Sequence, residues 1–327
     1  MIAQGYNILA LSSCVPKNNV PNSFFENLKS QRDLRVFAKT VGILNRRWAS
    51  EEINTTELAY HASKLIVNNV NKNDIKAVLF VSQTPEYQIP FTSNILQHKL
   101  DLKKEVLTLD LNLGCAGFIQ AIYTALSILK NLEVNDKILI VFSETLSKIL
   151  DKKDSATNML FGDGASAILI NKENNLNKAY FNFFTDGSNY QAIKTVNENG
   201  SNKLKMNGKD VFDFTLREIS SSIDLLLNKY QFNLNEIDLI ALHQSNNFII
   251  DQICIQLGLA KNDPRIIRGI RDFGNTSSVS IPLALNKNFE NQTISKNILC
   301  SGYGSGLTWA NAIINFDNCL IHKIKEI

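Results

Sequence analysis

A weak internal repeat limits what this chain can fold into more than any other feature of its sequence. Four blocks, each typical of a strand or of a turn beside one, occur twice and in the same order. The paired blocks are residues 74–80 and 236–242, 107–115 and 267–275, 137–140 and 297–300, and 161–164 and 303–306. The repeat predicts two similar halves, which we place at residues 1–172 and 173–327.

Nearly continuous apolar strands alternate with helical patterns in both halves. Residues 77–81 and 137–142 are such strands, and residues 55–70 and 216–230 have helical periodicity. Strands that are apolar on both faces are typical of sheets covered by helices on each side. With 327 residues, of which 44% are hydrophobic, the chain can bury two such sheets. The sequence therefore predicts a layered α/β architecture with one sheet in each half.

Charge and cysteine content exclude several classes of protein. Lys and Arg number 34 against 31 for Asp and Glu, and the charges are interspersed, which predicts neither a nucleic-acid nor a membrane partner. No apolar run approaches the roughly 20 residues of a membrane helix, and residues 1–10 are expected to be a first strand rather than a signal sequence. The five cysteines are scattered without a C-x-x-C pair, so we expect a reducing cytoplasm and no metal site.

Cys115 is the candidate nucleophile. It follows an apolar strand and precedes a helix expected to begin near Ala116, with glycines at 114 and 117 that permit a sharp turn. A thiol at a helix N-terminus is expected to have its pKa lowered below the free value of about 8.5. A thiolate suits thioester exchange. Considered alone, a cysteine after a strand is more often a buried packing residue.

His243 and Asn275 are the other candidate site residues. His243 ends the apolar strand 239–242, and strand ends are where sites collect in α/β sheets; the other three histidines lie on predicted helices or at the tail. Asn275 occupies in the second half the position that Cys115 holds in the first, so the repeat brings the two together. Its amide could donate to an oxyanion, although Asn followed by Thr and Ser is also a typical helix cap. The Gly-Ser-Gly turn at 304–306 offers backbone N–H groups for the same purpose.

Four motifs together resemble the β-ketoacyl-acyl-carrier-protein synthase III family, nearly from end to end of the chain. They are Gly-Cys-Ala-Gly at 114–117, His-Gln-Ser-Asn at 243–246, Gly-Asn-Thr-Ser at 274–277 and Tyr-Gly-Ser-Gly-Leu-Thr-Trp at 303–309, with supporting matches at 40–43, 161–165 and 206–212. The resemblance implies a thiolase-like fold of two α/β halves in five layers, α-β-α-β-α.

The resemblance also implies roles for individual residues. Cys115 would accept an acyl group, with the carbonyl oxygen held by the backbone N–H groups of Cys115 and Ser305. His243 and Asn275 would then bind the thioester oxygen of a malonyl unit on acyl carrier protein and stabilise the enolate formed by decarboxylation. No cofactor or metal is implied beyond the acyl thioesters, acyl-CoA or acyl-acyl-carrier protein.

The implied partner subunit and substrate contacts involve three further residues. The family is a homodimer in which the loop matching residues 84–90 reaches into the partner's acyl pocket, and Ile89 stands at the position that helps set acyl chain size. Gly208 and Asn246 are implied to contact substrate.

The chain departs from the family where the thioester carrier binds. The residues that sandwich the adenine of coenzyme A fall at Val36 and Ser155, neither of which can stack on a purine. The basic residues that meet acyl carrier protein fall at Asp213, Phe248, Ile255 and Gln256, and the candidates to replace them are Lys209, Lys261 and Arg265. The departures leave the acyl donor open and favour a specialised pathway over general fatty-acid initiation.

Three alternatives follow from the same residues. Acyl-Cys115 could pass its acyl group to an alcohol or amine, and malonyl-dependent release of carbon dioxide separates this from condensation. A hydroxymethylglutaryl-type synthase needs a carboxylate base, for which Glu86 and Glu144 are the candidates. A non-catalytic dimer subunit is the third alternative, but such a subunit would be expected to lose the cysteine.

Overall fold

The computed structural model describes residues 1–174 and 177–327, and its main sheet has two wings. The first wing contains, in spatial order, β6 (Leu107–Leu111), β5 (Ile75–Val81), β7 (Lys137–Glu144), β8 (Gly164–Lys172) and β2 (Tyr6–Val15). The second contains β12 (Leu239–Leu242), β13 (Gln292–Gly304), β14 (Thr308–Ile321), β9 (Lys178–Thr185) and β1 (Ile2–Gln4). A short parallel pairing of β14 with β2 joins the wings, and β15 (Lys325–Glu326) pairs with β2.

The order of strands in the second wing repeats the order in the first. β12, β13 and β14 take the places of β5, β7 and β8, as the paired sequence blocks predicted. The prediction of a strand at residues 267–275 is wrong, because this segment forms the short helix α8 (Ile270–Phe273). Just before it, Ile266 forms an isolated bridge with Ile240 of β12. The segment contains two glycines and three charged side chains, which a strand buried on both faces cannot accommodate.

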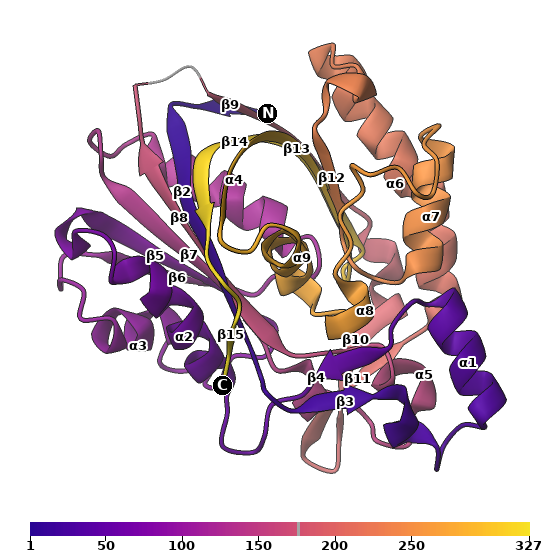
Figure 1. Ribbon diagram of the computed structural model, residues 1–327. Helices are drawn as coiled ribbons and strands as arrows, with labels where there is room; N and C mark the ends of the chain where they lie inside the picture. The colour runs from indigo at the N-terminus through magenta and orange to yellow at the C-terminus, as the bar shows by residue number, and fades with distance from the viewer. Residues whose placement is uncertain (175–176) are drawn as a thin grey trace.

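Helices separate and cover the two wings, giving the predicted α-β-α-β-α layers (Figure 1). α4 (Gly117–Leu129) and α9 (Ser280–Asn288) lie between the wings and belong to the largest core cluster. α2 (Thr55–Val67) and α3 (Thr92–Lys99) cover the outer face of the first wing. α6 (Gly208–Tyr230) and α7 (Asn247–Gln256) cover the outer face of the second. α4 is apolar almost all round because sheets enclose it on both sides.

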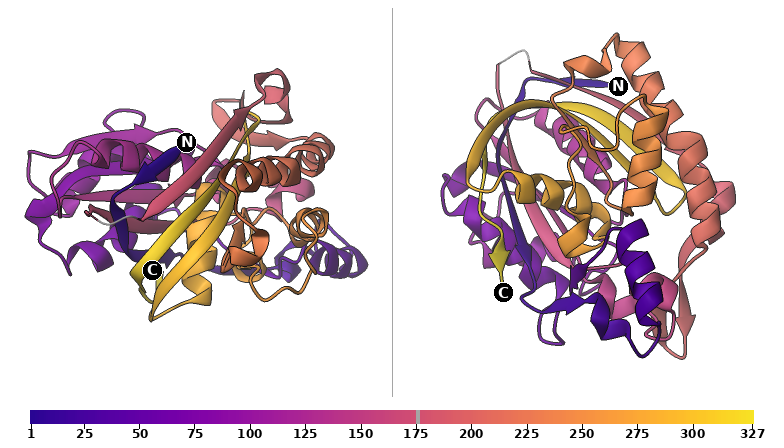
Figure 2. Two further views of the ribbon diagram at one scale, coloured as in Figure 1. Left: turned by 90° about the horizontal axis from the view of Figure 1, so that it is seen from above. Right: turned by 45° about the vertical axis from the view of Figure 1, so that its right-hand side comes forward.

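Shorter elements gather at one end of the layers (Figures 1 and 2). They are α1 (Gln31–Thr40), α5 (Ser155–Asn158), the hairpin of β3 (Asn19–Pro21) and β4 (Asn45–Arg47), and the hairpin of β10 (Ile193–Glu198) and β11 (Ser201–Met206). Single 3₁₀ turns occur at Asn22–Phe25, Lys72–Asp74, Leu146–Ile149, Gly187–Ala192, Leu234–Glu236 and Ser277–Val279. Of these elements, α1, α5 and the β10–β11 hairpin contribute residues to the wall of the cavity described below. Among the described residues, no helix combines the length and apolar character needed to cross a bilayer.

Candidate active site

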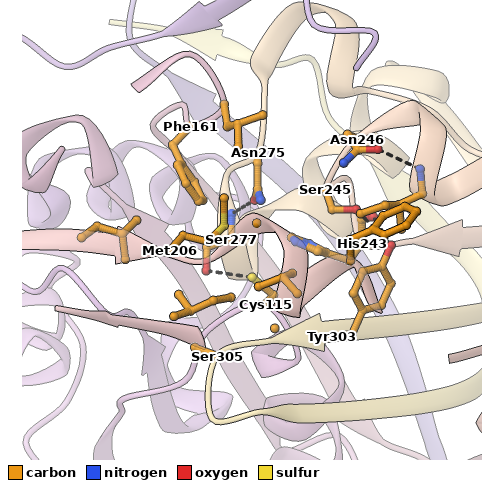
Figure 3. A pocket seen from close by; sticks show the side chains of 18 of the residues that line it. Cys115, Phe161, Met206, His243, Ser245, Asn246, Asn275, Ser277, Tyr303 and Ser305 are labelled. Carbon is orange, nitrogen blue, oxygen red and sulfur yellow. Dashed lines mark hydrogen bonds between the residues drawn. The ribbon is translucent and has the colours of Figure 1, made fainter. Parts of the chain in front are cut away.

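A cavity of about 540 Å³ brings together the three residues that the sequence singled out. Cys115, His243 and Asn275 all line it, from three separate turns, and their side chains face the same space (Figure 3). The walls of the cavity are mostly apolar and include Phe161, Met206 and Phe212. Within the described residues, no three His, Cys, Asp or Glu side chains are grouped so as to hold a metal ion.

The backbone at the end of strand β13 lies in close contact with Cys115. A Cβ added to Gly304 would lie 2.8 Å from the Cys115 Sγ, and one added to Gly302 would lie 2.7 Å from the Cys115 carbonyl oxygen. Both distances are shorter than any real carbon contact, so only glycine allows the backbone to approach this closely. The Gly-Ser-Gly turn that follows is thereby held beside the sulfur.

Cys115 lies just before α4, as predicted, but its pKa shifts in the opposite direction to the one predicted. Burial raises the pKa of the Cys115 thiol to about 12, although the Ser277 hydroxyl, 3.7 Å from the sulfur, partly opposes this. The cost of removing a thiolate from water outweighs the hydrogen bond from Ser277, and the Glu144 carboxyl raises the pKa further. The thiol is therefore protonated at neutral pH, and its proton must leave during attack.

The alkylation rate of Cys115 should rise with pH without levelling off. Below its pKa, the reactive thiolate fraction grows about tenfold per pH unit, so iodoacetamide should modify Cys115 about tenfold faster at each unit from pH 6 to pH 9. The other four cysteines are buried, which makes Cys115 the accessible thiol. Mass spectrometry of the labelled protein measures this rate. A plateau below pH 8 would show that the helix N-terminus outweighs burial.

His243 is a buried, neutral imidazole. It follows β12, its backbone N–H donates to the Ser301 carbonyl at 2.8 Å, and its ring meets the Tyr303 ring edge to face at 5.3 Å. Burial lowers the pKa of His243 to about 3, so the ring carries one N–H and no charge at neutral pH. Nδ1 is buried without a partner among the described residues, which leaves Nε2 to face the cavity. A neutral ring can donate a hydrogen bond without charging the site.

The orientation of the Asn275 amide is set by Ser277. The Ser277 backbone N–H donates to Asn275 Oδ1 at 2.9 Å, so this atom must be the oxygen and Nδ2 must be the donor that remains. Ser277 reaches this position with a left-handed backbone, φ 51°, which a non-glycine residue seldom adopts. Asn275 thus does more than cap a helix, since its NH₂ group is left for a ligand.

Two backbone N–H groups near the sulfur are not used in secondary structure. Among the described residues, neither Cys115 nor Ser305 donates its backbone N–H to another residue's carbonyl, although the Cys115 N–H contacts its own sulfur. The Ser305 hydroxyl accepts from Gln83 Nε2 at 3.1 Å, and Gln83 Oε1 accepts from the Ser277 hydroxyl at 3.5 Å. Sequence reasoning missed Gln83, although it follows β5 as His243 follows β12.

Glu144 lies beneath the site rather than in the cavity. Its carboxyl group, fully buried at the end of β7, accepts hydrogen bonds from the Gln83 backbone N–H at 3.0 Å and the Thr84 hydroxyl at 2.5 Å. The hydroxyls of Ser82 and Ser278 each lie 3.4 Å away. Burial raises the pKa of Glu144 to about 7. The group ties together the turns that carry Gln83 and Asn275, and does not line the cavity as a base would.

Glu144→Gln should alter how stability depends on pH. The folded pKa of Glu144 lies above its unfolded value, so between pH 4.5 and 7 the folded chain holds a proton that the unfolded chain lacks. The stability from this group is therefore present below pH 4.5 and lost as pH rises through 7, by up to roughly 3 kcal/mol. Glutamine cannot titrate, so the wild type should lose more stability than the variant across this range in urea unfolding. Parallel pH profiles would contradict this assignment.

The remaining sequence candidates divide into two groups. Gly208 and Asn246 line the cavity, and Asn246 also caps α7 by accepting from the Ile249 N–H at 2.7 Å. Ile89 is 88% exposed and does not line the cavity of its own chain. Val36 and Ser155 line a smaller groove beside the cavity entrance.

Arg265 cannot serve as a free docking cation. Its guanidinium forms an ion pair with Asp263 at 2.8 Å and donates to the Leu234 carbonyl. Phe248 is exposed and stacks on Phe212 at the cavity entrance, with ring centroids 5.8 Å apart.

Two family models match the sequence. 3-Oxoacyl-[acyl-carrier-protein (ACP)] synthase III matches residues 109–187, and 3-Oxoacyl-[acyl-carrier-protein (ACP)] synthase III C terminal matches residues 227–316. The β-ketoacyl-[acyl-carrier-protein] synthase III of Staphylococcus haemolyticus is 32% identical over 314 residues, which cover 94% of this chain and 98% of the relative. The matched regions contain Cys115, His243 and Asn275.

Solved structures share the fold over almost the whole chain. The 3-oxoacyl-(acyl-carrier protein) synthase of Burkholderia xenovorans LB400 superimposes with a TM-score of 0.94 at 27% identity and covers 100% of this chain and 98% of its own. The β-ketoacyl-[acyl carrier protein] synthase III of Thermus thermophilus has a TM-score of 0.85 at 30% identity, covering 95% and 99%. The thiolase-like architecture predicted from sequence is confirmed.

Proposed function

Because the chain belongs to the β-ketoacyl-acyl-carrier-protein synthase III family, we propose that it transfers an acyl group from a thioester to Cys115 and condenses it with malonyl-acyl-carrier protein. The protein is an acyltransferase of the 3-oxoacyl-acyl-carrier-protein synthase type. The observation that carries the proposal is the convergence of a thiol, a neutral imidazole and an oriented amide on one largely apolar cavity.

In the first half-reaction, the Cys115 sulfur attacks the thioester carbonyl. The oxyanion accepts hydrogen bonds from the backbone N–H groups of Cys115 and Ser305, which the fold leaves unused. The bond from the carbonyl carbon to the carrier sulfur then breaks. The departing thiolate takes up the proton lost by Cys115, so the step ends with an acyl-enzyme and a free carrier thiol.

In the second half-reaction, the malonyl thioester oxygen accepts hydrogen bonds from neutral His243 and from Asn275 Nδ2. The carbon–carboxylate bond breaks, carbon dioxide leaves, and the electron pair forms an enolate on that oxygen. The enolate carbon attacks the acyl-Cys115 carbonyl, a carbon–carbon bond forms, and the bond to sulfur breaks. Cys115 leaves as a thiolate, which takes a proton from solvent to restore the thiol. A neutral histidine suits this step because the donor need not gain or lose a proton.

Intact-protein mass spectrometry tests the proposal most directly. The purified chain is mixed with a panel of acyl-CoA and acyl-carrier thioesters, and malonyl-acyl-carrier protein is then added. We expect a mass gain on Cys115 that disappears when the malonyl thioester is added, together with release of carbon dioxide. A gain that malonyl thioester does not discharge would favour transfer to another acceptor, and no gain from any donor would contradict a catalytic role.

The assembly is proposed to be a homodimer formed through β6 and the loop that precedes α3. β6 is an edge strand of the first wing, and Leu107 on it is exposed. The loop presents Tyr87, Ile89 and Phe91 to solvent. An open strand beside a cluster of exposed apolar side chains is typical of a protein interface. The division into halves at residues 172 and 173 is also proposed, supported by the repeated strand order.

Ile89→Trp should shorten the acyl chain that the enzyme accepts. If Ile89 enters the partner's acyl pocket, the larger indole takes up space that the end of the acyl chain would fill. Acylation of Cys115 across a series of chain lengths, measured by mass spectrometry, should shift toward shorter chains while the shortest donor reacts as in the wild type. Ultracentrifugation should show a dimer. An unchanged chain-length profile would place Ile89 outside the acyl pocket.

A further inference from the structure

Helices α1, α6 and α7 form the entrance to the cavity, and they differ in the charge of their exposed side chains. α1 contributes Phe37 and the following Val41, and α6 and α7 contribute Phe212 and Asn246. The Asn247 backbone N–H donates to the Val41 carbonyl at 2.8 Å, which fixes the end of α1 beside the start of α7. A macromolecule that delivers a thioester to Cys115 must therefore contact at least one of these three helices.

One face of α1 is cationic and exposed. Arg32, Arg35, Val36 and Lys39 are spaced i, i+3, i+4 and i+7, so they form one stripe along the helix. Val36 is 56% exposed and lies between the cations. None of these three cations forms an ion pair with any residue that the structure describes. The one acidic residue of α1, Asp33, accepts a hydrogen bond from the Ser30 hydroxyl at the helix cap, and its backbone N–H donates to the same Ser30 oxygen.

A groove connects this stripe to the catalytic cavity. Val36, Thr40, Ser155 and Met159 line a space of about 370 Å³ that shares Phe37 and Val41 with the wall of the catalytic cavity. A flexible arm carried by a partner on α1 would have a continuous path along the groove toward Cys115. The opposite rim has the wrong charge for an acidic partner, because Asp210 and Asp213 follow Lys209 on the first turns of α6.

We propose that the α1 stripe formed by Arg32, Arg35, Val36 and Lys39 is the surface on which an acidic carrier protein docks to deliver its thioester to Cys115. The inference rests on the proposed function. It assigns a basic docking surface to α1, because α7 has no basic side chains at the positions where the sequence resemblance places them. An acidic helix of the carrier meets the three cations, and an apolar side chain at its centre meets Val36. Such complementarity acts mainly on encounter and weakens with salt.

Reversing the charge of the stripe tests this surface. The variant R32E/R35E/K39E is compared with K130E/K229E/K287E, which changes net charge equally at exposed lysines away from the entrance. We expect KM for malonyl-acyl-carrier protein to rise about tenfold or more in the first variant only, and its dependence on ionic strength to weaken. Kinetic constants with malonyl-pantetheine, which lacks the carrier, should match the wild type in both variants, as should thermal melting.

Two other measurements separate this inference from the function on which it rests. Binding of the carrier protein to the Cys115→Ala variant is measured by fluorescence anisotropy, without turnover, and should weaken when the stripe is reversed. Full activity on small thioesters with unchanged carrier KM in R32E/R35E/K39E would overturn the docking surface and leave the function intact. A larger effect of Lys209→Glu than of the stripe reversal would also overturn it. Carrier binding through α1 without any condensation would overturn the function.

Discussion

Cys115→Ala should abolish the acyl-enzyme and reduce condensation by about 10⁴-fold or more. The reason lies in the geometry, because among the described residues Cys115 is the one cysteine that lines the cavity and the other four are buried elsewhere. No neighbouring group can replace the sulfur: the nearest hydroxyl, that of Ser277, is bound in the network with Gln83. Mass spectrometry after incubation with acyl thioesters measures the adduct, and formation of the 3-oxoacyl-carrier product measures condensation.

A matched cysteine variant provides the control. Cys254→Ala removes a thiol that is buried in α7 and packed in the core of the second wing, so it should keep wild-type acylation despite some loss of stability. Covalent adduct in Cys115→Ala at the wild-type level would contradict the central assignment. Decarboxylation of malonyl thioester without an acyl-enzyme is expected to survive at a low rate in Cys115→Ala, because His243 and Asn275 remain in place.

The internal repeat predicted more of the site than any single motif could. It placed Asn275 opposite Cys115, and both line one cavity although they are 160 residues apart. Local patterns also gave most of the layers, since α2, β5 and β7 lie where apolar periodicity predicted them. Strand ends and turn glycines can be predicted from sequence because they are determined by residues that are adjacent in the chain.

Features that depend on contacts between distant turns could not be read in this way. Gln83 was missed, and Glu144 was considered only as a base. The Gln83 side chain donates to the Ser305 hydroxyl and its backbone N–H donates to Glu144, and no local pattern marks these contacts between strand ends. The strand expected at 267–275 failed because the repeat retained the position of the turn but not the strand before it. The predicted lowering of the Cys115 pKa was wrong because the prediction considered the helix N-terminus and omitted burial, which is the largest cause of the shift.

His243→Ala and Asn275→Ala should each separate the two half-reactions. Neither residue is needed for the Cys115 oxyanion, so acylation should stay within a few-fold of wild type. Condensation should fall roughly 10²- to 10³-fold in each variant, which is the usual loss when one donor to a developing oxyanion is removed. The double variant should lose less than the product of the single losses, because both donors serve one oxygen.

Asn275→Asp is the sharper variant of the pair. It keeps the oxygen that accepts from the Ser277 N–H and replaces the NH₂ donor with a second carboxyl oxygen, so the turn should hold its shape while the donor is lost and an ionised carboxylate repels the developing enolate. Single-turnover assays then measure acylation and carbon dioxide release separately, with His98→Ala on the exposed end of α3 as a histidine control. If Asn275→Asp condensed at the wild-type rate, the amide would be structural and the enolate would depend on His243 alone. If acylation failed in both alanine variants while the folds remained intact, the two residues would act on Cys115 itself, and the division of labour proposed for this cavity would be wrong.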